Sequence, residues 1–370
     1  MQNNTESKSK LIRLIEGSPD RQISFKSYMA YCLYDEQYGY YHRSTVKIGK
    51  DGDFYTSSSV GPMMGRTLAA AIRKLLQQEG WADGPWQIAE WGGGNGRLAL
   101  HMLDCLRQEA PAPYARLTYT LVERSPYHRT LQQDALRKHE RVRFRTPEEW
   151  LAESSAIPTI VCSNELLDAF PVHRLRYAQG RFEELFVRWD PSRERLEEVY
   201  APITERQLLD AIRAYGLPER EGQLFELNTD AASWIRSVAE RLNPGGLITI
   251  DYGDTADELY GPHRMRGTLM CYRKHQAHDD PYVHIGEQDM TAHVNFSACI
   301  QAGIEAGLTQ WTLQTQRAFL VENGILDQLQ AHDGRDPFSP EARANRAIRQ
   351  LLLSDQMSEL FKVLIQFPTK

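Results

Sequence analysis

Short apolar runs alternate with helix-spaced stretches along most of the chain, and this alternation determines the predicted fold. The runs are typical of buried strands, whereas apolar residues three or four positions apart predict helices between some of them. We expect strands at 86–91, 117–123, 142–145, 159–165 and 245–253, and helices near 97–109, 126–139 and 230–242. The pattern predicts an α/β fold with a mostly parallel sheet and helices on both faces. Ligands of such sheets bind at the carboxyl ends of the strands.

The remaining segments predict additions to this core. Residues 1–20 are typical of a polar tail with one amphipathic turn, and 23–43 carry helical spacing before a Tyr- and Gly-rich break. A further helix is expected between Pro62, at its start, and Gly80, past its end. Alternation and turn residues in 172–200 predict a β-meander inserted after the fourth strand, followed by a helix near 203–215.

Two later segments differ from the rest. Residues 254–295 are polar and rich in His, Tyr and Arg, and a long ordered loop of this kind is more often functional than idle. Ser339-Pro340 is a good helix start, and we expect a C-terminal helix from there through 367. We therefore divide the chain into 1–60, 61–171, 172–228 and 229–370.

Composition narrows the class of protein. The 370 residues are 41% apolar and 25% charged, which permits a sizeable core. A net charge of -6 and the lack of a basic block argue against nucleic-acid binding. The five cysteines are widely spaced with no CxxC, which predicts neither a disulfide framework nor a zinc site and favours the reducing cytoplasm. We find no signal-peptide pattern and no membrane-spanning window, so we expect no membrane association.

The stretch IAEWGGGNGRL, residues 88–98, carries the most specific chemistry. Its glycines follow a predicted strand and precede a predicted helix, where bare backbone lets a ligand approach closely. The dinucleotide pattern G-x-G-x-x-G fails here, because Arg97 and Asn95 occupy required glycine positions. The pattern that fits is Glu90, Gly92, Gly94 and Gly96, which resembles motif I of class I S-adenosylmethionine-dependent methyltransferases. An acid at the strand end suits this cationic donor. The alternative interpretation of the stretch is a tight structural turn with a solvent-facing acid.

A second carboxylate is expected at the end of the next strand. Glu123 lies about 30 residues further on, where an acid can accept hydrogen bonds from both ribose hydroxyls. NAD enzymes also carry such an acid, and a surface acid at a strand end is the remaining alternative. In combination with the glycine pattern, Glu123 supports the methyl donor.

Longer segments extend the resemblance to a family. In chain order they are 52–65, 163–174, 250–253, 267–296 and the ending MSELFKVLIQ. Together they resemble the MidA-like methyltransferases, the family of the mitochondrial complex I assembly arginine methyltransferase, from about residue 10 to the end. The resemblance implies a Rossmann-like core with an N-terminal helical extension and an inserted lobe. It also implies S-adenosyl-L-methionine as cofactor and protein arginine methylation as activity.

The chain departs from the family near the donor. The family usually has proline at the place of Gly93, arginine at Asn95, a small hydroxyl residue at Arg97 and a Pro-Glu pair at Ser58-Ser59. Glycine and asparagine still permit a tight turn, so donor binding is expected to survive. The acceptor stays open between a protein side chain and a small molecule.

The predicted acceptor side follows the fourth strand, in NELLDAFP. Asn164, Glu165 and Asp168 are the candidate catalytic residues there. We expect Glu165 to grip the acceptor, because carboxylates that bind a guanidinium can also accept its proton. Asp168 is expected to support Glu165, with helix capping as its alternative. Asp251 and Tyr252, after the fifth strand, are expected to line the same side.

Two further segments are expected to close the site. The family resemblance implies that Asp53, Phe54, Tyr55 and Thr56 form a lid over the donor, and a structural turn is the alternative. The histidine-rich loop is expected to select the acceptor through His278 and Asp279. A metal cluster is the rival interpretation of that loop, although its spacing matches no metal signature. The residues concerned are His275, His278, Asp279, Asp280, His284 and His293.

These patterns leave three other functions open. They are a small-molecule methyltransferase, a non-catalytic assembly factor that binds the donor, and, least favoured, an NAD oxidoreductase. We expect no metal, allow for a homodimer, and expect a protein or small-molecule acceptor as the partner.

Overall fold

A computed structural model confirms the predicted α/β class. It describes residues 2–47, 49, 52–53, 61–153, 156–332, 335–354 and 359–369. All five predicted strands are present, and they pair in parallel in the order β10-β5-β2-β3-β4. Their bounds are β2 (Trp86–Trp91), β3 (Leu117–Val122), β4 (Val142–Arg145), β5 (Thr159–Asn164) and β10 (Gly245–Asp254).

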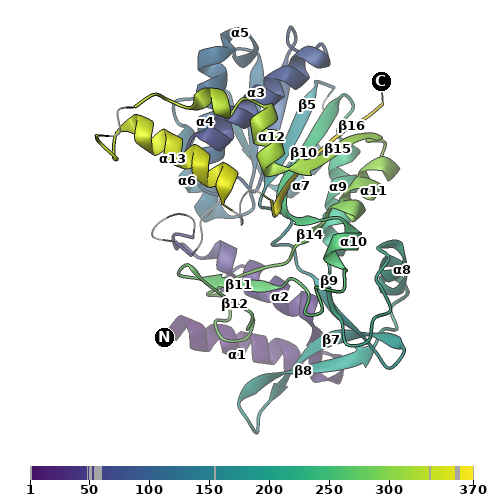
Figure 1. The fold of residues 1–370 in the computed structure, drawn as a ribbon. Coiled ribbons are helices and arrows are strands. Elements are labelled where there is room, and N and C mark those ends of the chain that lie inside the picture. Colours follow the sequence, from purple (N-terminus) through teal and green to yellow (C-terminus); the bar gives the residue numbers. More distant parts are fainter. Residues whose placement is uncertain are drawn as a thin grey trace.

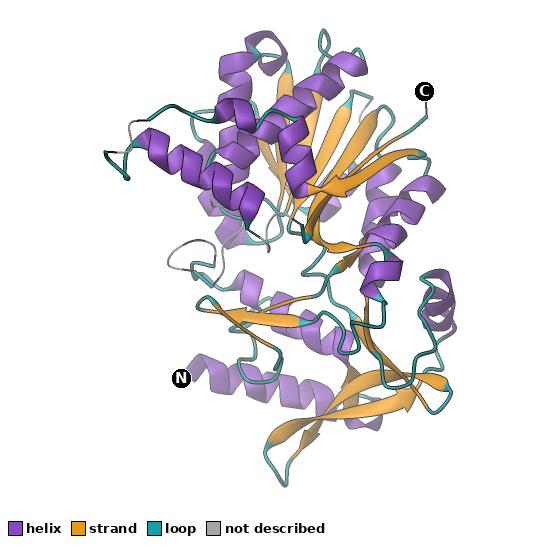
Figure 2. Cartoon of the chain, in the orientation of Figure 1, coloured by secondary structure: helices purple, strands orange, loops and turns teal. Residues whose placement is uncertain are grey.

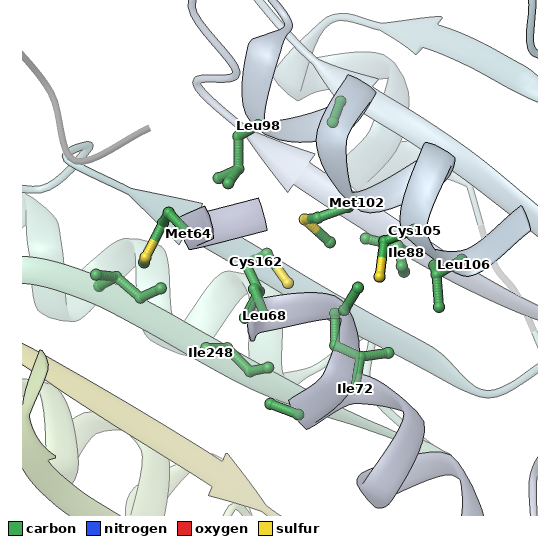
Figure 3. Close-up of a cluster of buried hydrophobic side chains, with 14 of the residues drawn as sticks. Met64, Leu68, Ile72, Ile88, Leu98, Met102, Cys105, Leu106, Cys162 and Ile248 are labelled. Atoms are coloured by element: carbon green, nitrogen blue, oxygen red, sulfur yellow. The ribbon is translucent and has the colours of Figure 1, made fainter. Parts of the chain in front are cut away.

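Helices cover both faces of this sheet (Figure 2). Successive strand residues face opposite sides, so Ile88 packs in one hydrophobic cluster and Ala89 in the other. Figure 3 shows the first cluster, where Leu68 and Met102 from two helices pack on Ile88, Cys162 and Ile248 from the strands. The covering helices on that face are α3 (Met63–Gln78), α4 (Arg97–Glu109), α12 (Gln316–Glu322) and α13 (Pro340–Leu353). On the other face they are α7 (Pro147–Ala152), α9 (Thr229–Ala239) and α11 (Phe296–Glu305).

Local capping explains several helix boundaries. The helix α6 (Pro126–Leu136) begins after Ser125, whose side chain accepts from the N–H of His128, and α13 begins in the same way after Ser339. Each helix has proline in its first turn, where its missing N–H costs nothing. The short helix α5 (Pro111–Tyr114) follows α4 directly.

The N-terminal prediction of a tail with one turn is wrong. The structure has a fifteen-residue helix, α1 (Gln2–Glu16), followed by η1 (Pro19–Arg21), β1 (Gln22–Ser24), α2 (Phe25–Tyr34) and η2 (Tyr40–His42). Leu11 and Ile15, four positions apart, are fully buried. The start of α1 is polar, so the sequence shows too few apolar positions to define the whole helix.

The predicted meander is confirmed and forms a second lobe with the N-terminal extension. The strands β6 (His173–Ala178), β7 (Arg181–Asp190) and β8 (Arg195–Pro202) are followed by α8 (Arg206–Ala214) and β9 (Leu224–Leu227). The strand β1 pairs with β7 in this sheet. A shared core of residues such as Phe25, Val187 and Met290 joins the extension, the meander and the histidine-rich segment. Figure 1 shows this lobe below the main sheet.

Residues 254–295, expected as a loop, contain regular structure instead. After α10 (Ala256–Leu259) come β11 (Met270–Arg273), β12 (Gln276–His278) and β13 (Asp289–Thr291), which form a three-stranded sheet. The next strand, β14 (Val294–Asn295), pairs in parallel with the end of β10. Strands of two to four residues are too short for their alternation to be found by sequence reasoning.

The predicted helix from 340 through 367 is wrong in its second half. The helix α13 ends at Leu353, and β16 (Phe361–Phe367) runs antiparallel between β10 and β15 (Gln310–Thr315). Val363 packs in the cluster on one face and Leu364 in the cluster on the other, which is strand alternation. A short apolar run fits a buried helix and a buried strand equally well, so periodicity did not decide between them.

No helix in the described part of the chain is both long and apolar enough to cross a membrane. All five cysteines are buried free thiols.

We predict that Gly253→Ala destabilises the protein by about 2 kcal/mol or more, as overpacking against rigid backbone does. A Cβ on Gly253 would lie 2.1 Å from the carbonyl oxygen of Val294, so β14 would have to move off β10. Urea unfolding measures the change. Gly84→Ala is the matched control, because a Cβ there meets nothing within 4 Å. Equal free energies of unfolding for the two variants would contradict the β10–β14 pairing.

Candidate active site

Most of the predicted site residues lie at one edge of the main sheet. The parallel strands β2, β3, β5 and β10 end along the same edge, because their hydrogen-bonded registers are aligned. Glu90 is the next-to-last residue of β2, Glu123 directly follows β3, and Glu165 directly follows β5. The fold therefore brings together carboxylates that are far apart in the sequence.

The glycine turn after β2 has the predicted bare, left-handed backbone. Gly92, Gly94 and Gly96 have φ angles of 68°, 51° and 78°, which side chains rarely adopt. Gly96 caps the start of α4. A Cβ on Gly92 would lie 2.8 Å from the side chain of Leu166, so the turn packs directly on the loop after β5.

Glu90 is a buried carboxyl beside this turn. It is 2% exposed and accepts a hydrogen bond of 2.5 Å from the Tyr119 hydroxyl. Burial, with a smaller contribution from Glu123, raises the pKa of Glu90 to about 7. Glu90 is therefore poised to become an anion near neutral pH when a cation approaches.

Glu123 is held by groups that the structure supplies locally. Its Oε1 accepts from the backbone N–H of Ser125 at 2.8 Å, and its Oε2 accepts from the Gln132 side chain at 3.3 Å. Burial raises the pKa of Glu123 from its ordinary value. The same Gln132 amide donates to the carbonyl of Gly94 at 3.0 Å, so it connects the glycine turn to Glu123. Gln132 is fully buried, and only its polar character within a helix could have signalled it.

The loop after β5 is fixed by a buried carboxylate. Oδ2 of Asp251 accepts from the backbone N–H groups of Leu166 and Leu167 at 3.1 and 2.9 Å. Asp251 is fully buried, and burial together with neighbouring Asp168 raises its pKa well above the ordinary value. This placement suits a residue that positions the loop better than one that contacts an acceptor.

Glu165 has an unusual backbone in this loop. Its φ of 54° is left-handed, which is uncommon for a residue other than glycine and clusters at functional sites. Its backbone N–H donates to Ile250 at 2.9 Å, and its Oε1 accepts from the Asn164 amide at 3.0 Å. Asn164 and Glu165 thus come together as predicted, with the amide orienting the carboxylate.

Asp168 does not cap a helix, because no helix begins in the loop that follows it, so that alternative is wrong. The side chain is buried, and the nearby Tyr252 hydroxyl favours its ionised form. Its Oδ1 has no partner among the described residues. Burial raises the pKa of Asp168 to about 6.

The N-terminal extension is hydrogen-bonded to the segments that follow these strands. The Tyr41 carbonyl accepts from the hydroxyl of Ser125 at 3.0 Å, and the Tyr34 hydroxyl donates to the carbonyl of Ala169 at 3.0 Å. Asp53 accepts from the Tyr40 hydroxyl at 2.9 Å and from the backbone N–H of Lys274 at 2.8 Å. The N-terminal extension is thereby tied to β3, to the loop after β5 and to the β11–β12 turn.

For the remaining predicted residues the described part of the structure gives no contact with the groups named above. Phe54, Tyr55, Thr56 and the departures Ser58 and Ser59 lie outside the described residues. Asp279 is exposed, and the described hydrogen bond of the His278 ring stays within its own segment, at the N–H of Asp280.

The rival metal interpretation gains no support. No group of three His, Cys, Asp or Glu side chains in the described part of the chain could hold a metal ion. The His293 ring packs against Tyr252, and His284 lies beside Arg273 instead.

Asp289 is, with Gln132, a site residue that sequence reasoning missed. It lies in the short strand β13, is 2% exposed, and accepts from the Tyr41 hydroxyl at 2.9 Å. Burial and neighbouring Asp168 raise its pKa to about 7. Its segment, 267–296, supports the family resemblance, but nothing in the local sequence distinguishes it from the other acids there.

Comparisons with known proteins agree with this geometry. The family model described as "Putative S-adenosyl-L-methionine-dependent methyltransferase" matches residues 65–313. A mitochondrial protein arginine methyltransferase NDUFAF7 homolog from Drosophila melanogaster is 26% identical, over 94% of this chain and 82% of that protein. NDUFAF7 from Danio rerio is 24% identical, over 92% and 82% of the two chains. The predicted resemblance is confirmed.

A solved structure is also similar along nearly the whole chain. This Burkholderia thailandensis protein was crystallised bound to S-adenosyl-homocysteine, and it is 30% identical with a TM-score of 0.86. The match covers 99% of this chain and 92% of that one.

We predict that affinity for S-adenosyl-homocysteine falls about tenfold between pH 8 and pH 6, because Glu90 with its pKa of about 7 takes up a proton in this range. The ammonium group of this ligand prefers the ionised carboxylate, so affinity is lost as the pH falls. Calorimetric titration measures the dissociation constant at each pH. Glu90→Gln should show a much shallower dependence, and an identical slope in both proteins would refute the role of Glu90.

We predict that Gln132→Met weakens S-adenosyl-homocysteine binding by up to about thirtyfold, since two hydrogen bonds at about 1 kcal/mol each, together about 2 kcal/mol, are removed. These bonds hold the Gly94 carbonyl and Glu123 in their present arrangement. The matched control is Gln133→Met at the next, exposed position of the same helix. Unchanged affinity in a folded Gln132→Met protein would show that the bridge is dispensable for the ligand.

Proposed function

We propose protein arginine methylation as the activity of this chain, which belongs to the S-adenosyl-L-methionine-dependent methyltransferase family matched at residues 65–313. The chain is therefore an enzyme with S-adenosyl-L-methionine as its cofactor. Arginine as the acceptor rests on the names of the Drosophila melanogaster and Danio rerio relatives. The conformation and setting of Glu165 support it.

The residues at the end of β2 and β3 fit the cofactor. The left-handed glycine turn offers backbone without side chains, and a Cβ at Gly96 would lie 3.2 Å from the backbone of Gln132. Glu90 supplies a carboxyl that ionises near neutral pH, and Glu123 supplies one that is already oriented. When bound, S-adenosyl-L-methionine supplies an activated methyl group. Asp53 is proposed to anchor the segment that covers it.

Glu165 is the residue that carries the acceptor proposal. A guanidinium is a poor nucleophile while fully charged, so a carboxylate that binds it and accepts a proton assists the transfer. Glu165 lies directly after β5, next to the turn that Gly92 makes against Leu166. Asp251 holds the loop, and Asn164 orients the Glu165 carboxylate. The proton would pass to a carboxylate oxygen of Glu165.

The other predicted acceptor-side residues take supporting roles in this proposal. The Tyr252 hydroxyl lies close to Asp168 and favours the ionised form of that side chain. His278 and Asp279 are proposed to contact the part of the acceptor that extends beyond the loop after β5. A protein partner fits this arrangement, and the homodimer stays a prediction. The buried free thiols support the proposal of a reducing compartment such as the cytoplasm.

We predict that Glu165→Gln lowers methyl transfer at least about 100-fold, the range of a lost general base, while the dissociation constant for S-adenosyl-homocysteine stays the same. Transfer is measured as label from S-adenosyl-L-methionine incorporated into lysate proteins, and mass spectrometry of the labelled band identifies the modified side chain. Glu194→Gln is the matched control, because Glu194 also has a left-handed φ, of 51°, but lies exposed in the β7–β8 turn.

Label on residues other than arginine would overturn the acceptor assignment. Label on small molecules alone would favour the alternative of a small-molecule methyltransferase. Full activity in Glu165→Gln would remove Glu165 from the mechanism.

A further inference from the structure

Buried carboxyls at the acceptor side lack the cations that accompany buried acids elsewhere in this protein. In the meander lobe, Glu183 pairs with two arginines and Glu226 pairs with Arg174. At the sheet edge, Asp168 and Asp289 are 4% and 2% exposed. Neither forms an ion pair with a Lys, Arg or His side chain of the described residues. Buried charge is normally paired, so these two carboxyls predict a cation that arrives with a ligand.

Backbone pairing brings together the two segments that carry these carboxyls. The N–H of Ala292, just after β13, donates to the carbonyl of Asp168 at 3.0 Å. This bond joins the strand that carries Asp289 to the loop that carries Asp168. Each carboxyl raises the pKa of a common neighbour, Tyr34, which also places them in one electrostatic environment.

A tyrosine hydroxyl lies beside each carboxyl, and one oxygen of Asp168 has no hydrogen-bond donor among the described residues. The Tyr41 hydroxyl and the N–H of Met290 both donate to Oδ1 of Asp289, at 2.9 and 3.0 Å. The Tyr252 hydroxyl lies close to Asp168, whose Oδ1 is buried with no partner among the described residues. A buried acceptor without a donor is costly, so a ligand N–H is expected there.

Other charged groups near these carboxyls do not supply the missing positive charge. Asp53 interacts with Asp289 and Asp251 interacts with Asp168, and both of these neighbours are acids. Lys47 is close enough to interact electrostatically with Asp289, but its ammonium donates to the backbone carbonyls of Arg43 and Thr45. Burial lowers the pKa of Lys47 to about 8.

We infer that Asp168 and Asp289 together form the binding site for the positive charge of the methyl acceptor. A guanidinium fits two carboxylates because its N–H donors form a planar fork. A metal ion fits less well, since no group of three potential metal ligands is found in the described part of the chain. The donor's own charge belongs with Glu90 at the end of β2. The inference rests on the proposed function and extends it to a residue of the histidine-rich segment.

The test compares a charged ligand with a neutral one of the same shape. Acetyl-glycyl-arginyl-glycine amide and the citrulline peptide of the same sequence are titrated into the full chain saturated with S-adenosyl-homocysteine. We expect the wild type to bind the arginine peptide about tenfold more tightly, as charge-assisted hydrogen bonds imply. In Asp289→Asn and in Asp168→Asn this ratio should fall towards one, with S-adenosyl-homocysteine affinity unchanged.

Asp254→Asn is the matched control, because this acid lies on the same edge but is already paired with Lys362. It should retain the wild-type ratio. A preference for arginine that persists in Asp289→Asn would overturn this inference and leave the proposed function standing. No preference in the wild type would instead refute arginine as the acceptor. A variant that lost S-adenosyl-homocysteine binding as well would show that Asp289 supports the fold and not the acceptor.

Discussion

The arrangement of the site depends on one buried carboxylate, that of Asp251. Its Oδ2 accepts from two successive backbone N–H groups, those of Leu166 and Leu167, in the loop after β5. Successive N–H groups can point at one oxygen only if the loop turns sharply, and the left-handed backbone of Glu165 makes that turn. The same loop packs through Leu166 on the glycine turn after β2. The predicted donor and acceptor sides therefore share one rigid connection.

The second lobe completes this edge of the sheet rather than folding as a separate addition. Its core contains residues of the N-terminal extension, the meander and the histidine-rich segment, so none of the three buries its apolar surface alone. The Tyr34 hydroxyl donates to the carbonyl of Ala169, and the Tyr41 carbonyl accepts from the Ser125 hydroxyl, so these bonds join the lobe to the strand ends. Glycine at 253 allows β14 to pair closely with β10, which brings the histidine-rich segment back to the sheet. The site is thus assembled from segments separated by most of the chain.

Sequence reasoning found the parts of the fold in which local pattern and tertiary environment agree. The central parallel strands are buried on both faces and are recognisable as apolar runs, and Glu90, Glu123 and Glu165 follow from being at strand ends. It failed for β16, where a short apolar run was compatible with either structure, and for β11–β13, where strands of three or four residues are too short to show a period. Gln132 and Asp289 were missed because their importance comes from partners distant in sequence, Gly94 and Tyr41.

The acids of the site can be distinguished by how many hydrogen bonds the protein already gives them. Asp251 receives backbone N–H donors on both carboxylate oxygens, so it has little capacity left for a ligand. Glu123 is held through both oxygens as well, but partly by a side chain that can adjust, and it can share its remaining lone pairs with hydroxyls. Asp168 alone among these keeps a buried oxygen without a partner in the described residues. An unsatisfied buried hydrogen-bond acceptor costs free energy. This oxygen of Asp168 therefore argues for a hydrogen-bond donor that arrives with the methyl acceptor, which a purely structural acid would not need.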